Sequence, residues 1–175
     1  MSHPGTRPPQ PEPVSPAERA VVGRQLGRPP RALAGVAHRC PCGQPDVVET
    51  SPRLEDGTPF PTLYYLTCPR ATAAASRLES AGRMRQWQDE LGTDAGLAEG
   101  YRAAHEADLA ERDALGELPT RATAGGMPDR VKCLHALAGH ALAAGPGVNP
   151  IGDRAVAGMG EWWAAGPCAR PEPAP

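Results

Sequence analysis

Several features that mark common protein classes are scarce or missing in this chain of 175 residues. Aromatic residues make up 4% of it, and Lys132 is its single lysine. The 18 basic and 20 acidic side chains nearly cancel, which excludes a polyelectrolyte built to bind nucleic acid or an anionic membrane. No run of residues approaches the roughly 20 apolar residues of a membrane span, and the N-terminus lacks the apolar segment of a signal peptide. We therefore expect a cytoplasmic protein with no membrane partner.

Proline and glycine are abundant instead, at 22 and 20 residues, whereas large apolar residues are few because 30 residues are alanine. The prolines cluster at both ends of the chain. We therefore expect a disordered leader over residues 1–16, a disordered tail over residues 166–175, and one domain with a thin core over residues 17–165.

Turn and cap signals divide the domain into a β part and an α part. Ser15 and Glu18 form a capping-box pattern, which predicts a helix that runs to about Leu26 and ends at Gly27. Apolar runs bounded by turn residues predict a three-stranded antiparallel sheet with strands over residues 33–38, 47–50 and 63–67. The Ala-rich remainder predicts helices over residues 70–81, 83–91, 94–115, 128–144 and 150–163, with Thr93 and Asn149 as N-caps. The fold class is α+β, a small antiparallel sheet followed by a helical cluster.

The cysteines are the strongest chemical signal. Cys40 and Cys42 lie in a Pro/Gly turn after a predicted strand, Cys68 ends another strand, and Cys133 falls in a predicted helical turn. Because paired strands bring their ends to one edge, we expect these four to gather near one site, which suits zinc or, less well, an iron–sulfur cluster. The alternatives are buried unligated thiols, and a redox switch at Cys40 or Cys42 whose thiol pKa is lowered by Arg39.

Helical geometry limits which other residues join Cys133. In a regular helix Cys133 and His135 point about 160° apart, so both cannot bind one ion. Cys133 and His140 share a flank, but the rise between them is roughly 10 Å. We therefore expect Cys133 to be the one ligand from this helix, with His135 and His140 as packed or surface histidines.

A second candidate site is the glycine loop before the same predicted helix. Gly125 and Gly126 run into a helix start marked by Pro128, and Arg130 and Lys132 follow in its first turn. Free backbone N–H groups and the helix dipole favour a phosphate or carboxylate at such a place. The alternative is an ordinary loop with solvated side chains.

Two further groups receive structural interpretations. His105 with Glu106 and Asp108 resembles an oriented histidine, but the surrounding segment is acidic throughout, so we expect a solvated face. Trp162 and Trp163 are expected to cap the core or to meet a protein partner.

Several sequence blocks resemble a known family. They are His38 to Val48, Asp56 to Arg70, Gly125 to His135, Gly145 to Pro150, and Glu161 to Trp163. These blocks are similar to an actinobacterial family catalogued as domain of unknown function number 501, and the resemblance runs from about Ala17 to Cys168. The family's genes tend to sit beside those for enolase, a septum-formation initiator and an exopolyphosphatase. The resemblance is therefore compatible with a cytoplasmic housekeeping role and with a phosphate-related ligand.

Two functions from different classes follow from these observations. The first is a cytoplasmic binding or regulatory module with a Cys-rich zinc site at Cys40, Cys42, Cys68 and Cys133. The second is a small enzyme for a phosphorylated or carboxylated metabolite, in which Arg130 and Lys132 hold the anion and His135 or His105 does acid–base chemistry.

Overall fold

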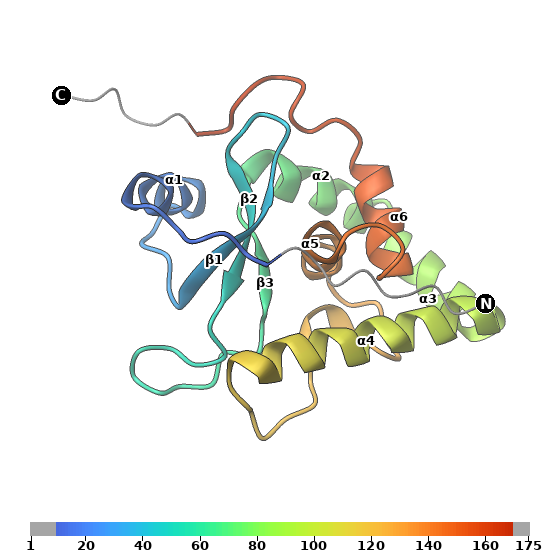
Figure 1. Ribbon diagram of the computed structural model, residues 1–175. Coiled ribbons are helices and arrows are strands. Elements are labelled where there is room, and N and C mark those ends of the chain that lie inside the picture. The colour runs from blue at the N-terminus through green and yellow to red at the C-terminus, as the bar shows by residue number, and fades with distance from the viewer. Residues whose placement is uncertain (1–9, 170–175) are drawn as a thin grey trace.

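The computed structural model describes residues 10–169, and the predictions for residues 1–9 and 170–175 lie outside the described residues. A small sheet lies on one side and a cluster of helices on the other, so the fold is α+β as predicted (Figure 1). The elements in chain order are α1 (Pro16–Leu26), β1 (Leu33–Arg39), β2 (Pro45–Thr50), β3 (Tyr64–Leu66), α2 (Pro69–Ser80), α3 (Arg83–Thr93), α4 (Ala95–Leu115), the short 3₁₀ helix η1 (Ala124–Gly126), α5 (Leu134–Ala144) and α6 (Pro150–Met159).

The sheet is antiparallel with the strand order β1-β2-β3, which confirms the predicted three-stranded sheet. At its middle, Val48 of β2 pairs with Val36 of β1 on one side and with Tyr65 of β3 on the other. Val36 also exchanges two backbone hydrogen bonds, of 2.8 and 2.9 Å, with Glu12. Glu12 is therefore paired with the sheet, so the disorder predicted over residues 1–16 does not hold for this part of the segment.

Helix α5 lies at the centre of the molecule, between the sheet and helices α2 and α6 (Figure 1). Most of its residues are buried, and they are mainly alanine and glycine with Leu134 and Leu137. Such small side chains allow close approach of neighbouring elements. A Cβ on Gly152 of α6 would lie 2.3 Å from the Leu137 carbonyl oxygen, so the packing of α5 on α6 requires glycine there.

Helix α1 covers the sheet from the other side (Figure 1). Val21 and Val22 of α1 are buried, and the Gln25 side chain donates to the Pro45 carbonyl oxygen of β2 at 2.7 Å. Within residues 10–169, no helix is both long enough and apolar enough to cross a membrane.

Local cap signals fixed most helix ends. The predicted capping box of Ser15 and Glu18 is present, Gly27 ends α1 with φ +70°, and Asn149 caps α6 by accepting from the Gly152 N–H. The prediction for Thr93 was wrong. Asp94 caps α4, because its carboxylate accepts from the Leu97 N–H at 2.9 Å.

Two predicted helices are too long. The helix predicted over 128–144 begins at Leu134, because the preceding N–H groups bond to other partners. The Val131 N–H donates to the Gln88 side chain at 2.8 Å, and the Lys132 N–H donates to the Gly125 carbonyl oxygen at 2.8 Å. The helix predicted over 150–163 ends at Met159, because Gly160 adopts φ +64°.

Candidate functional site

The first two predicted zinc ligands, Cys40 and Cys42, lie beside each other, and Cys40 is shielded from solvent. Cys40 follows β1 and is buried, and Cys42 lies two residues on in the β1–β2 hairpin. Burial is the main reason that the pKa of the Cys40 thiol is raised to about 12, and contact with the Cys42 thiol adds to it. The redox interpretation required a lowered pKa at Cys40 or Cys42, and for Cys40 it is wrong.

Arg39 cannot supply the missing positive charge to Cys40. Its guanidinium donates to the carboxylates of Glu12 and Glu18, at 2.5 and 2.6 Å. These two ion pairs hold the segment before α1 and the first turn of α1 on the end of β1. Arg39 is thus neutralised by structural partners and does not activate a thiol.

Cys68 lies in a different environment, at the N-cap of α2. It is buried, and its side-chain partner is Cys168 from the C-terminal segment, which also accepts from the Gln25 side chain at 3.3 Å. Burial again is the main cause that raises the pKa of the Cys68 thiol to about 12. Like Cys40, this thiol fills the core.

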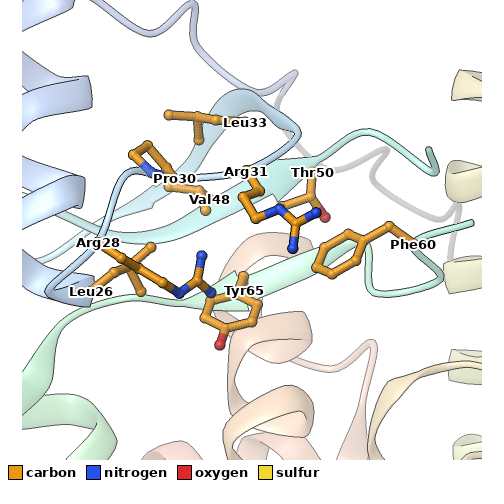
Figure 2. A pocket seen from close by; sticks show the side chains of 9 residues that line it. All are labelled: Leu26, Arg28, Pro30, Arg31, Leu33, Val48, Thr50, Phe60 and Tyr65. Carbon is orange, nitrogen blue, oxygen red and sulfur yellow. The ribbon is translucent and has the colours of Figure 1, made fainter. Parts of the chain in front are cut away.

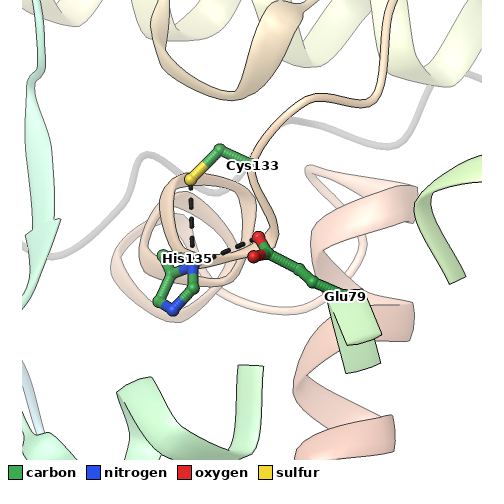
Figure 3. Close-up of side chains that lie close together, drawn as sticks. All are labelled: Glu79, Cys133 and His135. Carbon is green, nitrogen blue, oxygen red and sulfur yellow. Dashed lines mark hydrogen bonds and ion pairs between the residues drawn. The ribbon is translucent and has the colours of Figure 1, made fainter. Parts of the chain in front are cut away.

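Among the described residues, the metal-ligating atoms that do gather in a group of three belong to Glu79, Cys133 and His135. These atoms all lie within 4.8 Å of one another, and Figure 3 shows the thiol and the carboxylate facing the same ring nitrogen. The predicted set of four cysteines does not form such a group. Of that set, Cys133 belongs to such a group of three, whereas Cys40 and Cys68 each lie beside one other thiol.

Cys133 and His135 meet because Cys133 is not helical. The prediction placed both side chains about 160° apart on a regular helix. In the structure Cys133 is the N-cap of α5 with extended backbone angles, φ −148° and ψ +106°, and its Sγ lies 3.9 Å from His135 Nδ1. The expectation that the two cannot share one site was therefore wrong, and the error follows from the predicted start of the helix.

Glu79 approaches this pair from the C-terminal end of α2. Its Oε1 lies 3.2 Å from His135 Nδ1 and accepts from the Leu134 N–H at 2.8 Å. A carboxylate at the N-terminus of a helix is favoured by the free N–H groups and by the helix dipole. Glu79 thus takes the position at the start of α5 that an external anion would need. No sequence signal links Glu79 to α5, because the two lie far apart in the chain.

The second ring nitrogen of His135 also faces acceptors. Nε2 lies 3.1 Å from the Thr72 carbonyl oxygen and 3.1 Å from Ser76 Oγ. With its one N–H on Nδ1, the neutral ring donates to Glu79 and accepts at Nε2 from the Ser76 hydroxyl. With the N–H on Nε2, the ring donates to the Thr72 carbonyl oxygen, and the lone pair of Nδ1 is available to a cation beside Glu79 and Cys133.

A pocket of about 360 Å³ lies beside this group. Cys133 and His135 line it together with Tyr64 and Tyr65 of β3, Thr72 of α2, and others from η1 and α5. Two of the three half-buried side chains of the group, Cys133 and His135, therefore border a space that a small molecule can enter.

The predicted anion site is not arranged as expected. Arg130 and Lys132 are exposed, they precede α5 instead of starting it, and the N–H groups of residues 130–132 are already bonded within the protein. The predicted anion ligands were Gly125, Gly126, Arg130 and Lys132. Of these four, Gly125 is the one that borders the pocket beside His135. Arg130 is exposed and does not line the pocket that His135 borders.

The other histidine predictions had mixed outcomes. His140 is packed as expected: it is 1% exposed, stacks on Tyr64 with ring centroids 6.0 Å apart, and burial lowers its pKa to about 4. The solvated face predicted for His105 and Asp108 was wrong, because both are buried. Burial, assisted by the charge of Glu111, raises the pKa of Asp108 to about 7.

The comparisons with known proteins give one match. The family model described as "Protein of unknown function (DUF501)" matches residues 36–157, from β1 through most of α6. No curated protein and no solved structure matches the chain. The match includes Glu79, Cys133 and His135 and covers more than half of the chain, so this protein belongs to the DUF501 family, as its sequence blocks indicated.

Proposed function

We propose that this protein is a zinc-binding module whose metal site is formed by Glu79, Cys133 and His135. The observation that carries the proposal is the facing of His135 Nδ1 toward both a thiol and a carboxylate. A thiolate, an imidazole nitrogen and a carboxylate oxygen are the three ligand types that zinc takes from proteins. Relative to the predicted set, Cys133 is retained and the other three cysteines are assigned to the core.

The distances in the group are close to those of a tetrahedral zinc site. With Zn–S of about 2.3 Å and Zn–N of about 2.0 Å, a tetrahedral angle places sulfur and nitrogen about 3.5 Å apart, and nitrogen and oxygen about 3.4 Å apart. The corresponding distances here are 3.9 Å for Cys133 Sγ to His135 Nδ1 and 3.2 Å for Glu79 Oε1 to Nδ1. Small side-chain rotations that move these atoms by a few tenths of an ångström bring the distances to those of a zinc site.

The surroundings of His135 also support a metal. A histidine that binds metal through one nitrogen usually donates the other N–H to a backbone carbonyl or a carboxylate, which fixes the ring. Here Thr72 offers its carbonyl oxygen to Nε2 at 3.1 Å. Glu79 Oε1 both caps α5 and lies nearest to Nδ1, and a carboxylate oxygen has a second lone pair that can bind a metal.

Three protein ligands favour zinc over an iron–sulfur cluster and suggest how the site works. Iron–sulfur clusters are held mainly by several cysteine thiolates, and this group contains one. A zinc ion with three protein ligands has one coordination position left, and the 360 Å³ pocket provides the path by which a small molecule reaches it. Bound there, zinc would supply Lewis-acid chemistry to that molecule.

We further propose that the protein works in the cytoplasm. All five cysteines are free thiols, which suits a reducing compartment. The site needs a thiolate at Cys133, which an oxidising compartment would not preserve.

A zinc titration tests the proposal. The untagged protein is stripped with a chelator and titrated with Zn²⁺ in competition with a chromophoric chelator. We expect one zinc per chain, and affinities at least about 100-fold weaker for Cys133→Ser and His135→Gln. Cys42→Ser is the matched control, because it removes a half-buried thiol from the β1–β2 hairpin and should leave the affinity unchanged. Binding that survives Cys133→Ser, or that Cys42→Ser weakens equally, would overturn the assignment.

A further inference from the structure

A second pocket, of about 70 Å³, lies on the side of the sheet that carries α1 (Figure 2). Its walls are formed by the end of α1, the loop that leads to β1, the three strands, and the connection between β2 and β3. Tyr65 lines this pocket and also the one beside Cys133. The zinc proposal makes no use of the second pocket.

Two arginines give this pocket its chemical character. Figure 2 shows the guanidinium groups of Arg28 and Arg31 directed into the same space, with the rings of Tyr65 and Phe60 beside them. No acidic side chain lines the pocket, and within residues 10–169 neither guanidinium has an ion-pair partner. Two like charges that share a hollow repel each other unless an anion lies between them.

Arg31 also lines a neighbouring hollow with Glu55 and Asp56, and its charge acts on the Asp56 carboxylate. Hydrogen bonds with Thr58 are the main cause that lowers the pKa of Asp56, and the charge of Arg31 contributes less. Asp56 does not line the pocket, and its carboxylate accepts from the Thr58 N–H at 2.9 Å. Asp56 is therefore engaged within its own turn.

The backbone holds both arginines in place. The Arg28 N–H donates to the Gly23 carbonyl oxygen at 3.2 Å, just after Gly27 ends α1. One residue after Arg31, the Ala32 carbonyl oxygen accepts from the Ser51 N–H at 2.7 Å. The loop that carries both arginines is thus tied to α1 at one end and to the residues after β2 at the other. This lowers the entropy cost of ordering the loop when a ligand binds.

We propose that this pocket binds the oxyanion of a small aromatic molecule, either a phosphate or a carboxylate. The guanidinium groups match such an oxyanion because their planar N–H forks donate two parallel hydrogen bonds. The volume fits one oxyanion group, and the aromatic part of the ligand would lie against Tyr65 and Phe60.

The probes are phenyl phosphate, benzoate and inorganic phosphate, with benzyl alcohol as the neutral counterpart, measured by calorimetry or by NMR titration of the full chain. We expect phenyl phosphate or benzoate to bind and benzyl alcohol not to bind. Arg28→Gln and Arg31→Gln should each weaken the affinity about tenfold, which corresponds to about 1.4 kcal/mol. Phe60→Ala should weaken phenyl phosphate and leave inorganic phosphate unchanged.

Arg102→Gln is the control, because it removes the same charge from an exposed position on α4. Both pocket arginines are exposed as well, so melting temperatures close to that of the unmodified protein are expected and verify folding. Equal weakening by Arg102→Gln, or equal binding of benzyl alcohol, would overturn the proposal. The relative affinities of phenyl phosphate and benzoate decide which oxyanion the site prefers. The measurements are made on protein stripped of metal with a chelator, so their outcome is independent of the zinc site.

Discussion

The cysteines of this protein occupy two contrasting regions. Cys40 and Cys68 are buried and each contacts another thiol, whereas Cys133 is half-buried, lies beside an imidazole and a carboxylate, and borders a pocket. The contrast shows that a cysteine's role depends on what lies next to it in space. In the first region, the thiol substitutes for a small apolar residue in a core that has few large ones. In the second, our proposal assigns the sulfur to a zinc ion.

The largest expected effect is on the rate at which the buried thiols of Cys40 and Cys68 are alkylated, compared between native and unfolded protein. A rise in thiol pKa from 9 to about 12 lowers the thiolate fraction at pH 8 about 1,000-fold at Cys40 and Cys68. Iodoacetamide should therefore modify these two at least 1,000-fold faster in urea than in the native protein, as measured by mass spectrometry of peptides. In metal-free native protein Cys133 should be modified well before either of them. Early modification of Cys40 or Cys68 would show that the two regions are not distinct.

The buried carboxylate of Asp108 sharpens the same contrast through pH. Folded Asp108 keeps its proton to about pH 7, because of burial and the charge of Glu111 and despite that of Arg112, whereas an unfolded aspartate loses it near pH 4. The folded state therefore binds more protons between about pH 4 and 7, so its stability falls as the pH rises through that range. His140, whose pKa is lowered to about 4, acts in the opposite direction between about pH 4 and 6.5.

Asp108→Asn removes one of these opposing contributions. We expect the variant to gain up to about 4 kcal/mol of unfolding free energy at pH 8 relative to the unmodified protein. Its stability should rise as the pH increases from 4 to 6.5, because the contribution of His140 is then no longer opposed by that of Asp108. Urea unfolding with a chelator present, at several pH values, measures both effects. Identical pH profiles for the two proteins would contradict the assignment.

Serine substitutions should separate stability from metal binding. Cys68→Ser places a hydroxyl in the core and should lower the unfolding free energy by about 1–3 kcal/mol with zinc affinity unchanged. Cys133→Ser should change the stability of the metal-free protein by less than about 0.5 kcal/mol while it abolishes tight zinc binding. Denaturant unfolding and zinc titration on both variants test this. Parallel losses in both quantities would mean that the two cysteines belong to one site.

Much of the fold follows from local sequence signals. The Ser15–Glu18 capping box, Gly27 and Asn149 mark helix ends that the structure confirms, and the apolar runs around Val36, Val48 and Tyr65 predict the sheet. These signals depend on neighbours in the chain, which a sequence displays directly.

The candidate site follows from contacts between distant segments, which local patterns do not contain. The Gln88 side chain accepts a hydrogen bond from the Val131 N–H, and the Glu79 carboxylate accepts one from the Leu134 N–H. Helix α5 therefore starts at Leu134. That later start places Cys133 outside the helix and turns it toward His135. Helical periodicity placed the two residues apart because it assumed a helix from residue 128.

Cobalt substitution tests the central claim most directly, which is that Cys133 is the thiolate that binds the metal. Co²⁺ replaces zinc in sites of this kind and gives a thiolate-to-cobalt absorption band when sulfur is a ligand. We predict this band in the unmodified protein, an unchanged band in a combined Cys40→Ser and Cys42→Ser variant, and no band in Cys133→Ser. A band that persists in Cys133→Ser, or that disappears in the combined variant, would contradict the account.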